Sequence, residues 1–441
     1  MARSLLGAGM SLTPSDTQNA AIKQVVDWFQ NRTEEQQVFR LFGYAGTGKS
    51  TTLKYALEEM GLSTEGTDPD VLIGTFTGKA SLVLRRKGTP AATIHSLAYS
   101  VFEATEEEMR QLGEKIEKAK VEALSLRGAD RLVADAAIVA MEEQRREMKR
   151  PRFALNPDSP ISRCKLLVLD EVSMVGPEMA ADLLSFGKPV LVLGDPGQLP
   201  PIKGEGAFTQ AEPDVMLTEI HRQAGESAVI RLATMARHGD FIPFGQHDEF
   251  VWKMNKSDVT PSHLLRGAQV ICGLNATRLA LNNAMRQAAG FASHLPAGRG
   301  EKIICLRNQN DVGLINGMFI ELDDVQVENE HWLTAAIRED DGTRIGTEGT
   351  KGPQRFKIYR GHFEDHVAFD RDRGDRDWKV KRTHKLVEAT FGWAITCHKA
   401  QGSGFDNVIV WDEHFGRTDE DRRRWLYTAI TRAEQGLVIL A

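Results

Sequence analysis

A short apolar run leads into a glycine-rich segment whose residue types suit the phosphates of a nucleotide. Residues 38–42 are predicted to form a strand, residues 43–50 read Gly-Tyr-Ala-Gly-Thr-Gly-Lys-Ser, and residues 51–60 are predicted to form a helix. Backbone N–H groups in such a loop turn toward phosphate oxygens, and the helix N-terminus adds partial positive charge. Lys49 would pair with the β- and γ-phosphates, and the Ser50 hydroxyl with Mg²⁺. The predicted nucleotide-binding residues here are Gly43, Ala45, Gly46, Thr47, Gly48, Lys49, Ser50 and Thr51.

Two carboxylates follow another apolar run and are the candidates for metal binding and proton transfer. Residues 165–169 are predicted to form a buried strand, and Asp170 and Glu171 come directly after it. Mg²⁺ bound to phosphates takes one or two carboxylates, a role that fits Asp170. Hydrolysis also needs a base for the attacking water, which fits Glu171. Gln198, in a Gly/Pro-rich segment after the next strand, is a candidate γ-phosphate sensor, although an ordinary turn is the simpler interpretation of that segment alone.

Charge that develops on a transferred phosphoryl group must be neutralised by cations from elsewhere in the chain. Arg222 and Arg432 are the candidates. An arginine that reaches in from a second lobe would couple closure of the lobes to hydrolysis. Considered alone, each is more often a surface arginine.

The elements that must position these residues alternate between strands and helices in two stretches. In the first stretch, further strands are predicted at residues 71–77 and 189–193. In the second, strands are predicted at residues 269–272, 301–306, 407–411 and 436–440, with a helix at 275–286.

Two segments depart from this alternation. Residues 105–149 are charged, and apolar residues recur at helical spacing (Met109, Leu112 and Ile116, then Leu132, Ala136 and Val139), which predicts two helices that form an arm. A solvated charged bundle without function is the equal alternative for this arm. Residues 318–384 are polar and turn-rich, which predicts a small β-rich insertion.

Composition limits the classes of protein. With 55 basic and 61 acidic residues the net charge is −6, which excludes a globally basic nucleic-acid coat but leaves room for a local basic groove. The 4 cysteines form no CxxC pair, which favours a reducing, cytoplasmic setting without a zinc site. The sequence contains no apolar run long enough to span a membrane and begins with no signal peptide.

The segments and their order resemble the superfamily 1 helicases, specifically the RecD/Dda branch. The resemblance implies an α/β fold with two RecA-like P-loop lobes, both built on parallel sheets. The first lobe would comprise residues 1–101 and 163–265, with an inserted helical arm and pin hairpin at 102–162. The second would comprise residues 266–317 and 385–441, with a β-rich SH3-like insertion at 318–384. The segments that carry the resemblance are Gln18 and residues 43–50, 75–80, 93–97, 153–160, 170–174, 194–201, 217–223, 396–403 and 427–433.

The resemblance adds residues to the expected site. Gln18 occupies the position at which the family has a glutamine that recognises adenine. Gln401 and Gly402 belong to the nucleotide-binding part of the fifth motif. The family commonly has a glutamate where this chain has Gly404, and that departure leaves nucleotide selectivity open. The expected contacts to single-stranded DNA are Thr77, Lys79, His95, Thr396, His398 and Ser403. For His95 and His398, a hydrogen-bonded core histidine is the alternative.

The function that the resemblance implies is an ATP-dependent, Mg²⁺-requiring DNA helicase moving 5′→3′. Its partners would be single-stranded DNA and tailed duplex DNA, with no membrane and, in a replication, repair or recombination setting, other proteins of those processes. A monomer is expected because both arginines lie in one chain. The alternatives are a single-strand translocase that unwinds poorly, an RNA-directed helicase, or a non-motor ATP-gated subunit of a nucleic-acid complex.

Overall fold

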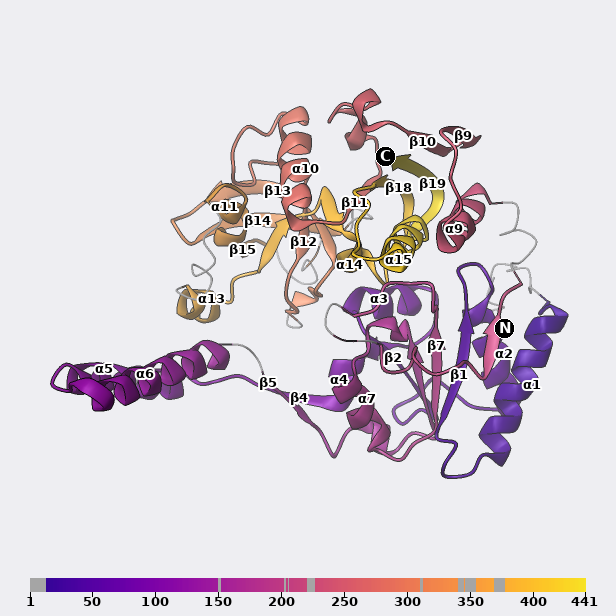
Figure 1. Ribbon diagram of the computed structural model, residues 1–441, viewed down its shortest axis with the longest axis horizontal. Coiled ribbons are helices and arrows are strands. Elements are labelled where there is room, and N and C mark those ends of the chain that lie inside the picture. Colours follow the sequence, from indigo (N-terminus) through magenta and orange to yellow (C-terminus); the bar gives the residue numbers. More distant parts are fainter. Residues whose placement is uncertain are drawn as a thin grey trace, which may run out of the picture.

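The computed structural model describes most of the chain. The described residues are 13–149, 152–201, 204, 206–219, 227–309, 312–339, 345, 354–368 and 377–441. They form two α/β lobes, a five-stranded antiparallel sheet, a two-stranded hairpin and a helical arm. Figure 1 shows the first lobe below the second, and the arm projecting away from the first lobe.

The first lobe is built on a six-stranded sheet in the order β3-β2-β6-β7-β1-β8, and its neighbouring strands all pair in parallel. The apolar runs predicted as strands are strands, because β6 and β7 are buried almost throughout and a parallel sheet is covered on both faces. Strands are β1 Val38–Gly43, β2 Val71–Thr75, β3 Ala92–Thr93, β6 Leu166–Asp170, β7 Val190–Gly194 and β8 Val215–Leu217. Helices are α1 Asp16–Asn31, α2 Lys49–Met60, α3 Gly78–Arg86, α4 Ile94–Ala98 and α7 Pro177–Leu184, with 3-10 turns η1 Pro160–Ser162 and η2 Val172–Met174.

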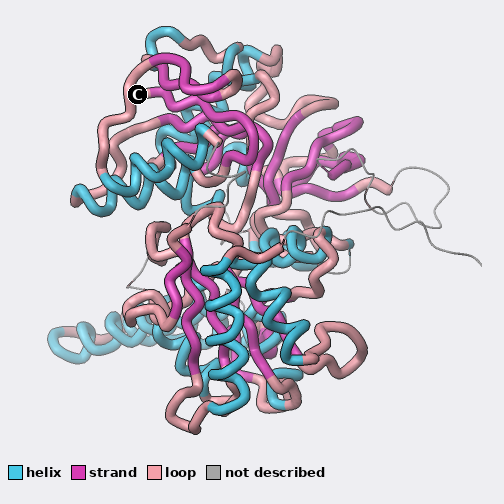
Figure 2. The backbone as a smooth tube through the Cα atoms, turned by 90° about the vertical axis from the view of Figure 1, so that its right-hand side faces the viewer, coloured by secondary structure: helices cyan, strands magenta, loops and turns pink. Residues whose placement is uncertain are grey.

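The second lobe is built on a six-stranded sheet in the order β17-β11-β18-β19-β10-β9. Its pairs are parallel except for β9 with β10. Strands are β9 Gly245–Asp248, β10 Val251–Met254, β11 Gln269–Cys272, β17 Ala394–Thr396, β18 Phe405–Trp411 and β19 Ala433–Leu440. Helices are α9 Ala228–His238, α10 Asn275–Ala288, α14 Cys397–Ala400 and α15 Asp419–Ile430, with 3-10 turns η3 Lys256–Asp258 and η4 His263–Leu265. Figure 2, turned by 90°, shows the two lobes stacked one on the other.

The predicted boundary between the lobes at residues 265/266 is wrong. β10 pairs with β19 of the second sheet, and α9 contributes buried residues such as Leu232 and Ala236 to the same core as α15. The chain therefore crosses to the second lobe between β8 and α9. The boundary was misplaced because β10 pairs with β19, a strand that lies far along the chain from β10.

The β-rich insertion is a five-stranded antiparallel sheet in the order β15-β14-β13-β12-β16. Its elements are β12 Glu301–Cys305, β13 Phe319–Val327, β14 Trp332–Glu339, β15 Phe356–Tyr359, β16 Ala389–Phe391, α11 Gly361–Ala368 and α13 Trp378–Thr383. The predicted limits of residues 318–384 are too narrow, because β12 and β16 pair within this sheet and not with the second lobe. A buried ion pair, Arg286 to Glu301 at 2.8 Å, ties β12 to helix α10 of that lobe.

The arm and the hairpin at its base emerge from the first lobe. β4 Tyr99–Phe102 pairs with β5 Arg152–Leu155, and α5 Glu106–Ala123 packs against α6 Gly128–Met148 between them. The predicted apolar face of α5 is correct, since Met109, Leu112 and Ile116 are buried. The face predicted for α6 is wrong, because Leu132 and Val139 are 72% and 60% exposed while Ile138 is buried. Of the helices described, none has the length and apolar character needed to cross a membrane.

Candidate functional site

The glycine-rich loop has the backbone shape that a phosphate site requires. Gly46 and Gly48 have φ of 80° and 78°, a region that favours glycine, and α2 begins at Lys49. A Cβ on Gly43 would lie 2.5 Å from Thr47 Oγ1, so this position has no room for a side chain. The Lys49 ammonium donates to the carbonyl of Gly43 at 2.6 Å and to that of Tyr44 at 3.2 Å.

Gln18 and the start of the Arg222 segment lie at one end of this loop. The Gln18 amide is buried and donates to the Thr47 carbonyl at 3.2 Å, which fixes helix α1 against the loop. Glu219 accepts a hydrogen bond from the Thr17 hydroxyl at 2.6 Å. Arg222 itself lies outside the described residues. Ser50 and Thr51 lie in the first turn of α2, and Ala45 precedes the loop's two left-handed glycines.

Asp170 and Glu171 lie at the carboxyl end of β6, where neighbouring parallel strands also end. Loss of hydration and the adjacent Glu171 carboxylate raise the pKa of Asp170 to about 6, although the Glu171 N–H and Lys49 act against this. The N–H of Glu171 donates to Asp170 Oδ1 at 2.9 Å. Glu171 has φ of 55°, a strained conformation of the kind that clusters at functional sites. The site is therefore acidic, and a divalent cation would offset the repulsion between its carboxylates.

Asp195 and Tyr427 connect the two lobes at this point, and the sequence analysis gave neither a role. The Tyr427 hydroxyl donates to Asp195 Oδ2 at 2.6 Å and accepts from the Ala45 N–H at 2.9 Å. Burial raises the pKa of Asp195, and nearby Lys49 lowers it. Arg237 of α9 lies over the Tyr44 ring at 3.4 Å and brings a further cation to the loop. The sequence did contain one indication that Asp195 belongs to the site, because this residue comes directly after a buried strand.

Gln198, Gln401 and Arg432 are buried where the lobes meet. The Gln401 amide donates to the Leu199 carbonyl at 3.0 Å, and the Oε1 atoms of Gln198 and Gln401 are buried with no hydrogen-bond partner. Such orphaned acceptors are costly unless a ligand or water satisfies them. Arg432 is 6% exposed and donates to the carbonyls of Thr428 and Ser403, so it is not a surface arginine.

The predicted nucleic-acid contacts all line one groove of about 500 Å³ between the lobes. Thr77 caps α3, and a Cβ on Gly402 would lie 2.8 Å from its Oγ1, so the two lobes approach closely here. Lys79 lies over the rings of Phe319 and Phe405 at 4.4 and 4.3 Å. The members of the predicted set, from both lobes, are Thr77, Lys79, His95, Thr396, His398 and Ser403.

An aromatic ring of the hairpin, Phe153, borders the same groove. His95 lies 5.0 Å from Phe153 and 5.8 Å from Tyr99, centroid to centroid. Phe153 is 47% exposed and offers its ring to the groove. Burial lowers the pKa of both His95 and His398, which favours the neutral imidazole in each. Lys399, which sequence reasoning did not select, also lines the groove and donates to Asn316 Oδ1 at 2.6 Å.

Comparison with known proteins agrees with this architecture. Residues 13–250 match the family model described as an AAA domain, and residues 391–440 match the one described as a UvrD-like helicase C-terminal domain. The chain is 26% identical over 290 residues to the ATP-dependent RecD2 DNA helicase of Deinococcus radiodurans. That alignment covers 61% of this chain and 35% of the relative, so the chain spans about a third of the relative's length.

Solved structures show the same fold. One describes DNA unwinding at forked double-stranded DNA by two coordinating Pif1 helicases, with a TM-score of 0.51, 19% identity, and coverage of 98% of this chain and 92% of that one. Another is the Pif1 helicase from Bacteroides in complex with ADP-AlF3 and single-stranded DNA, with a TM-score of 0.50, 19% identity, and coverage of 98% and 93%.

The fold and the glycine-rich loop together define a two-lobed α/β protein of the P-loop class. The chain belongs to the AAA-domain family, whose model matches residues 13–250, more than half of its length.

Proposed function

We propose that this protein is an ATP-dependent DNA helicase that moves 5′→3′ along one strand and opens duplex ahead of it. The observation that carries the proposal is the groove, because residues from both lobes line it beside the interface that holds the phosphate loop. A strand bound there would touch both lobes at once. The named activities of the RecD2 and Pif1 relatives support this assignment.

The residues of the phosphate loop fit ATP with Mg²⁺. Lys49 would bind the phosphates, Ser50 and Asp170 would hold the metal, and Gln18 would read the base. When bound, ATP supplies the phosphoryl group that is transferred to water, and Mg²⁺ screens its charge. Glu171 would accept the proton of the attacking water. Arg432 and Arg222 would neutralise the charge that develops, with Gln198 and Gln401 as sensors.

One short segment links the two sites. Residues 396–403 line the groove through Thr396, His398 and Ser403, while Gln401 in the same segment binds the Leu199 carbonyl of the first lobe. The Ser403 carbonyl also accepts a hydrogen bond from Arg432 at 3.2 Å. Movement of the lobes at the nucleotide would therefore shift the groove contacts, which is how hydrolysis would drive steps along a strand.

The inserted elements complete the proposal. The β4–β5 hairpin, with Phe153 exposed beside the groove, would act as the pin that parts the duplex. The five-stranded sheet would be the SH3-like insertion that flanks the strand. A cytoplasmic monomer that works with replication, repair or recombination proteins is proposed. The four cysteines are unpaired and buried, which supports a reducing compartment.

The direct test of the motor is ATP hydrolysis with and without nucleic acid. We expect a low basal rate that rises strongly with single-stranded DNA, because the strand bridges both lobes and favours their closed arrangement. Single-stranded RNA of matched sequence is the comparison that reveals substrate preference. Equal rates with and without any nucleic acid would reject the motor assignment.

We expect Tyr427→Phe to lower the stimulated hydrolysis rate by roughly 10- to 100-fold, because a hydrogen bond to a charged acceptor contributes about 1.5–3 kcal/mol. The hydroxyl is the group of the second lobe that contacts both Ala45 and Asp195. Nucleotide affinity measured by titration should stay unchanged. Tyr55→Phe, on the first-lobe helix α2, serves as the matched control. A stimulated rate equal to wild type would show that this contact does not couple the lobes.

Lys79→Ala and His398→Ala should both weaken binding to oligo-dT, but they should differ in their salt dependence. Lys79 is a cation, so its loss should reduce the log–log salt slope by about 0.7, the contribution of one phosphate contact on a single strand. Burial lowers the pKa of His398 and so favours its neutral form, and its loss should therefore leave the slope unchanged. Fluorescence anisotropy at several salt concentrations measures both. Equal slope changes for the two variants would contradict the neutral assignment.

A further inference from the structure

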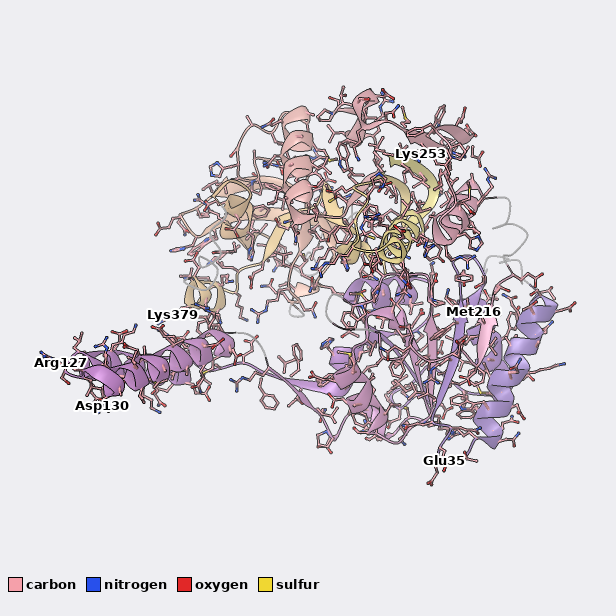
Figure 3. The ribbon with its side chains drawn as sticks, in the orientation of Figure 1. Glu35, Arg127, Asp130, Met216, Lys253 and Lys379 are labelled. Atoms are coloured by element: carbon pink, nitrogen blue, oxygen red, sulfur yellow. The ribbon has the colours of Figure 1, made fainter. Side chains whose placement is uncertain are left out.

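A second cavity, of about 430 Å³, lies where the base of the arm meets helix α13. The Trp378 indole N–H donates to the Lys149 carbonyl at 3.1 Å, and Lys379 lies 3.8 Å from Glu106. Arg307 forms an ion pair with Glu103 at 2.6 Å. Figure 3 shows Lys379 beside the base of the arm, far from Arg127 and Asp130 at its tip. The first lobe and the insertion thus build this cavity together.

The described residues that line the cavity include more cations than carboxylates. Among these residues the carboxylates are Glu103, which contacts Arg307 and Arg382, and Glu388, which contacts Arg307 and Lys381. Lys149 and Lys385 are further cationic residues of the described lining. A partly enclosed space with excess positive charge attracts anions, because the surrounding protein screens charge less than water does.

The cavity continues the groove of the proposed function. Asn308 lines both spaces, so they are neighbours along one surface. Trp378 offers a half-buried ring in the second cavity, with the Arg382 guanidinium 5.4 Å from its centroid. A basic channel with an aromatic platform is the usual arrangement for a single strand, whose phosphates meet cations while its bases stack on rings.

We propose that this cavity is a second binding site for the strand that occupies the groove, with Arg307 and Lys385 meeting its phosphates and Trp378 stacking on a base. The proposal rests on the proposed function, because it extends the path of the same strand. The path would run from the groove past Asn308 to the base of the arm. The arm would then have a role in holding nucleic acid, in place of the functionless charged bundle.

The test compares oligo-dT of increasing length by fluorescence anisotropy at several salt concentrations. For the wild type, affinity should rise beyond the length that fills the groove. Arg307→Ala and Lys385→Ala should each lose part of that additional affinity, and each should reduce the salt slope by about 0.7 on long oligonucleotides while leaving short ones unchanged. Lys118→Ala, on an exposed lysine of the arm outside the cavity, is the matched control.

The variant Glu103→Gln distinguishes a strand-binding role of the cavity from a purely structural role of the ion pair between Arg307 and Glu103. It breaks the same ion pair as Arg307→Ala but leaves the cavity more positive. A strand site predicts opposite effects, with weaker binding for Arg307→Ala and equal or tighter binding for Glu103→Gln. Weaker binding for both variants, or no change for either, would overturn the proposal.

Wild-type protein gives an independent readout. Photocrosslinking from 4-thiothymidine placed along a long oligo-dT should label the peptide that contains Trp378. Labelling confined to groove peptides would also overturn the second site. Failure of the wild type to bind any oligonucleotide would instead reject the proposed function itself.

Discussion

We expect Glu171→Gln to reduce the maximal rate of ATP hydrolysis by about 10²–10⁴-fold, the range that a positioned general base contributes. The amide has nearly the shape of the carboxylate but cannot take a proton from water. Glu171 follows the strand that carries Asp170 and is held in a strained backbone conformation with φ of 55°. This backbone strain is consistent with a catalytic role for the Glu171 side chain.

Nucleotide affinity should survive this change, because Lys49 and the loop backbone would make the phosphate contacts. Steady-state hydrolysis and titration with a fluorescent ATP analogue measure the two properties separately. Glu178→Gln, an exposed carboxylate on α7 of the same lobe, is the control and should hydrolyse ATP normally. Near-normal turnover by Glu171→Gln would show that another group is the base.

The second large effect is expected from Lys49→Ala, which should weaken nucleotide binding by at least about 10- to 100-fold, the equivalent of roughly 1.5–3 kcal/mol for a hydrogen bond to a charged group. The ammonium donates to two carbonyls of the loop, and phosphate oxygens would be its partners when nucleotide is bound. The substitution removes both the charge and the loop contacts.

The same titration measures this loss. Lys54→Ala is the matched control, because Lys54 lies on the same helix with its side chain 74% exposed. It should bind nucleotide as the wild type does. If Lys49→Ala kept normal affinity while hydrolysis fell, the lysine would act on the transition state and not on binding, and its assigned role in binding would be wrong.

Local sequence signals predicted the strands and helices well, but not the partition into lobes. Buried parallel strands such as residues 166–170 appear as continuous apolar runs, so they are recognisable without tertiary information. The pairing of β10 with β19, and of β12 with β16, joins segments far apart in the chain. A local sequence pattern cannot show which distant strands pair. For that reason both the predicted boundary between the lobes and the predicted limits of the β-rich insertion were misplaced.

The arm illustrates the same limit on a smaller scale. Residues on α6 such as Leu132 and Val139 recur at helical spacing, yet the face that meets α5 contains Ile138. Apolar periodicity identifies a helix. It does not determine which of several apolar faces of that helix packs against the neighbouring helix. Packing against α5 decides between them.

Within the candidate site, the sequence identified the residues that motifs carry and missed those defined by contact between lobes. Asp195 and Tyr427 become a pair only when the lobes meet, and Arg237 lies on a helix with no motif of its own. The groove residues were selected from separate motifs, and the fold brings Thr77 and His398 to one space. Their roles remain predictions for the experiments above.

Strand displacement on tailed duplexes tests the central claim most directly. Fluorescently labelled DNA duplexes with a 5′ tail, a 3′ tail or no tail are mixed with protein and ATP, and release of the labelled strand is followed. We predict opening that requires ATP and a 5′ single-stranded tail, because the strand must enter the groove before the duplex meets the β4–β5 hairpin. Efficient opening with only a 3′ tail would contradict the direction of movement, and no opening of any substrate by an actively hydrolysing protein would contradict the helicase assignment.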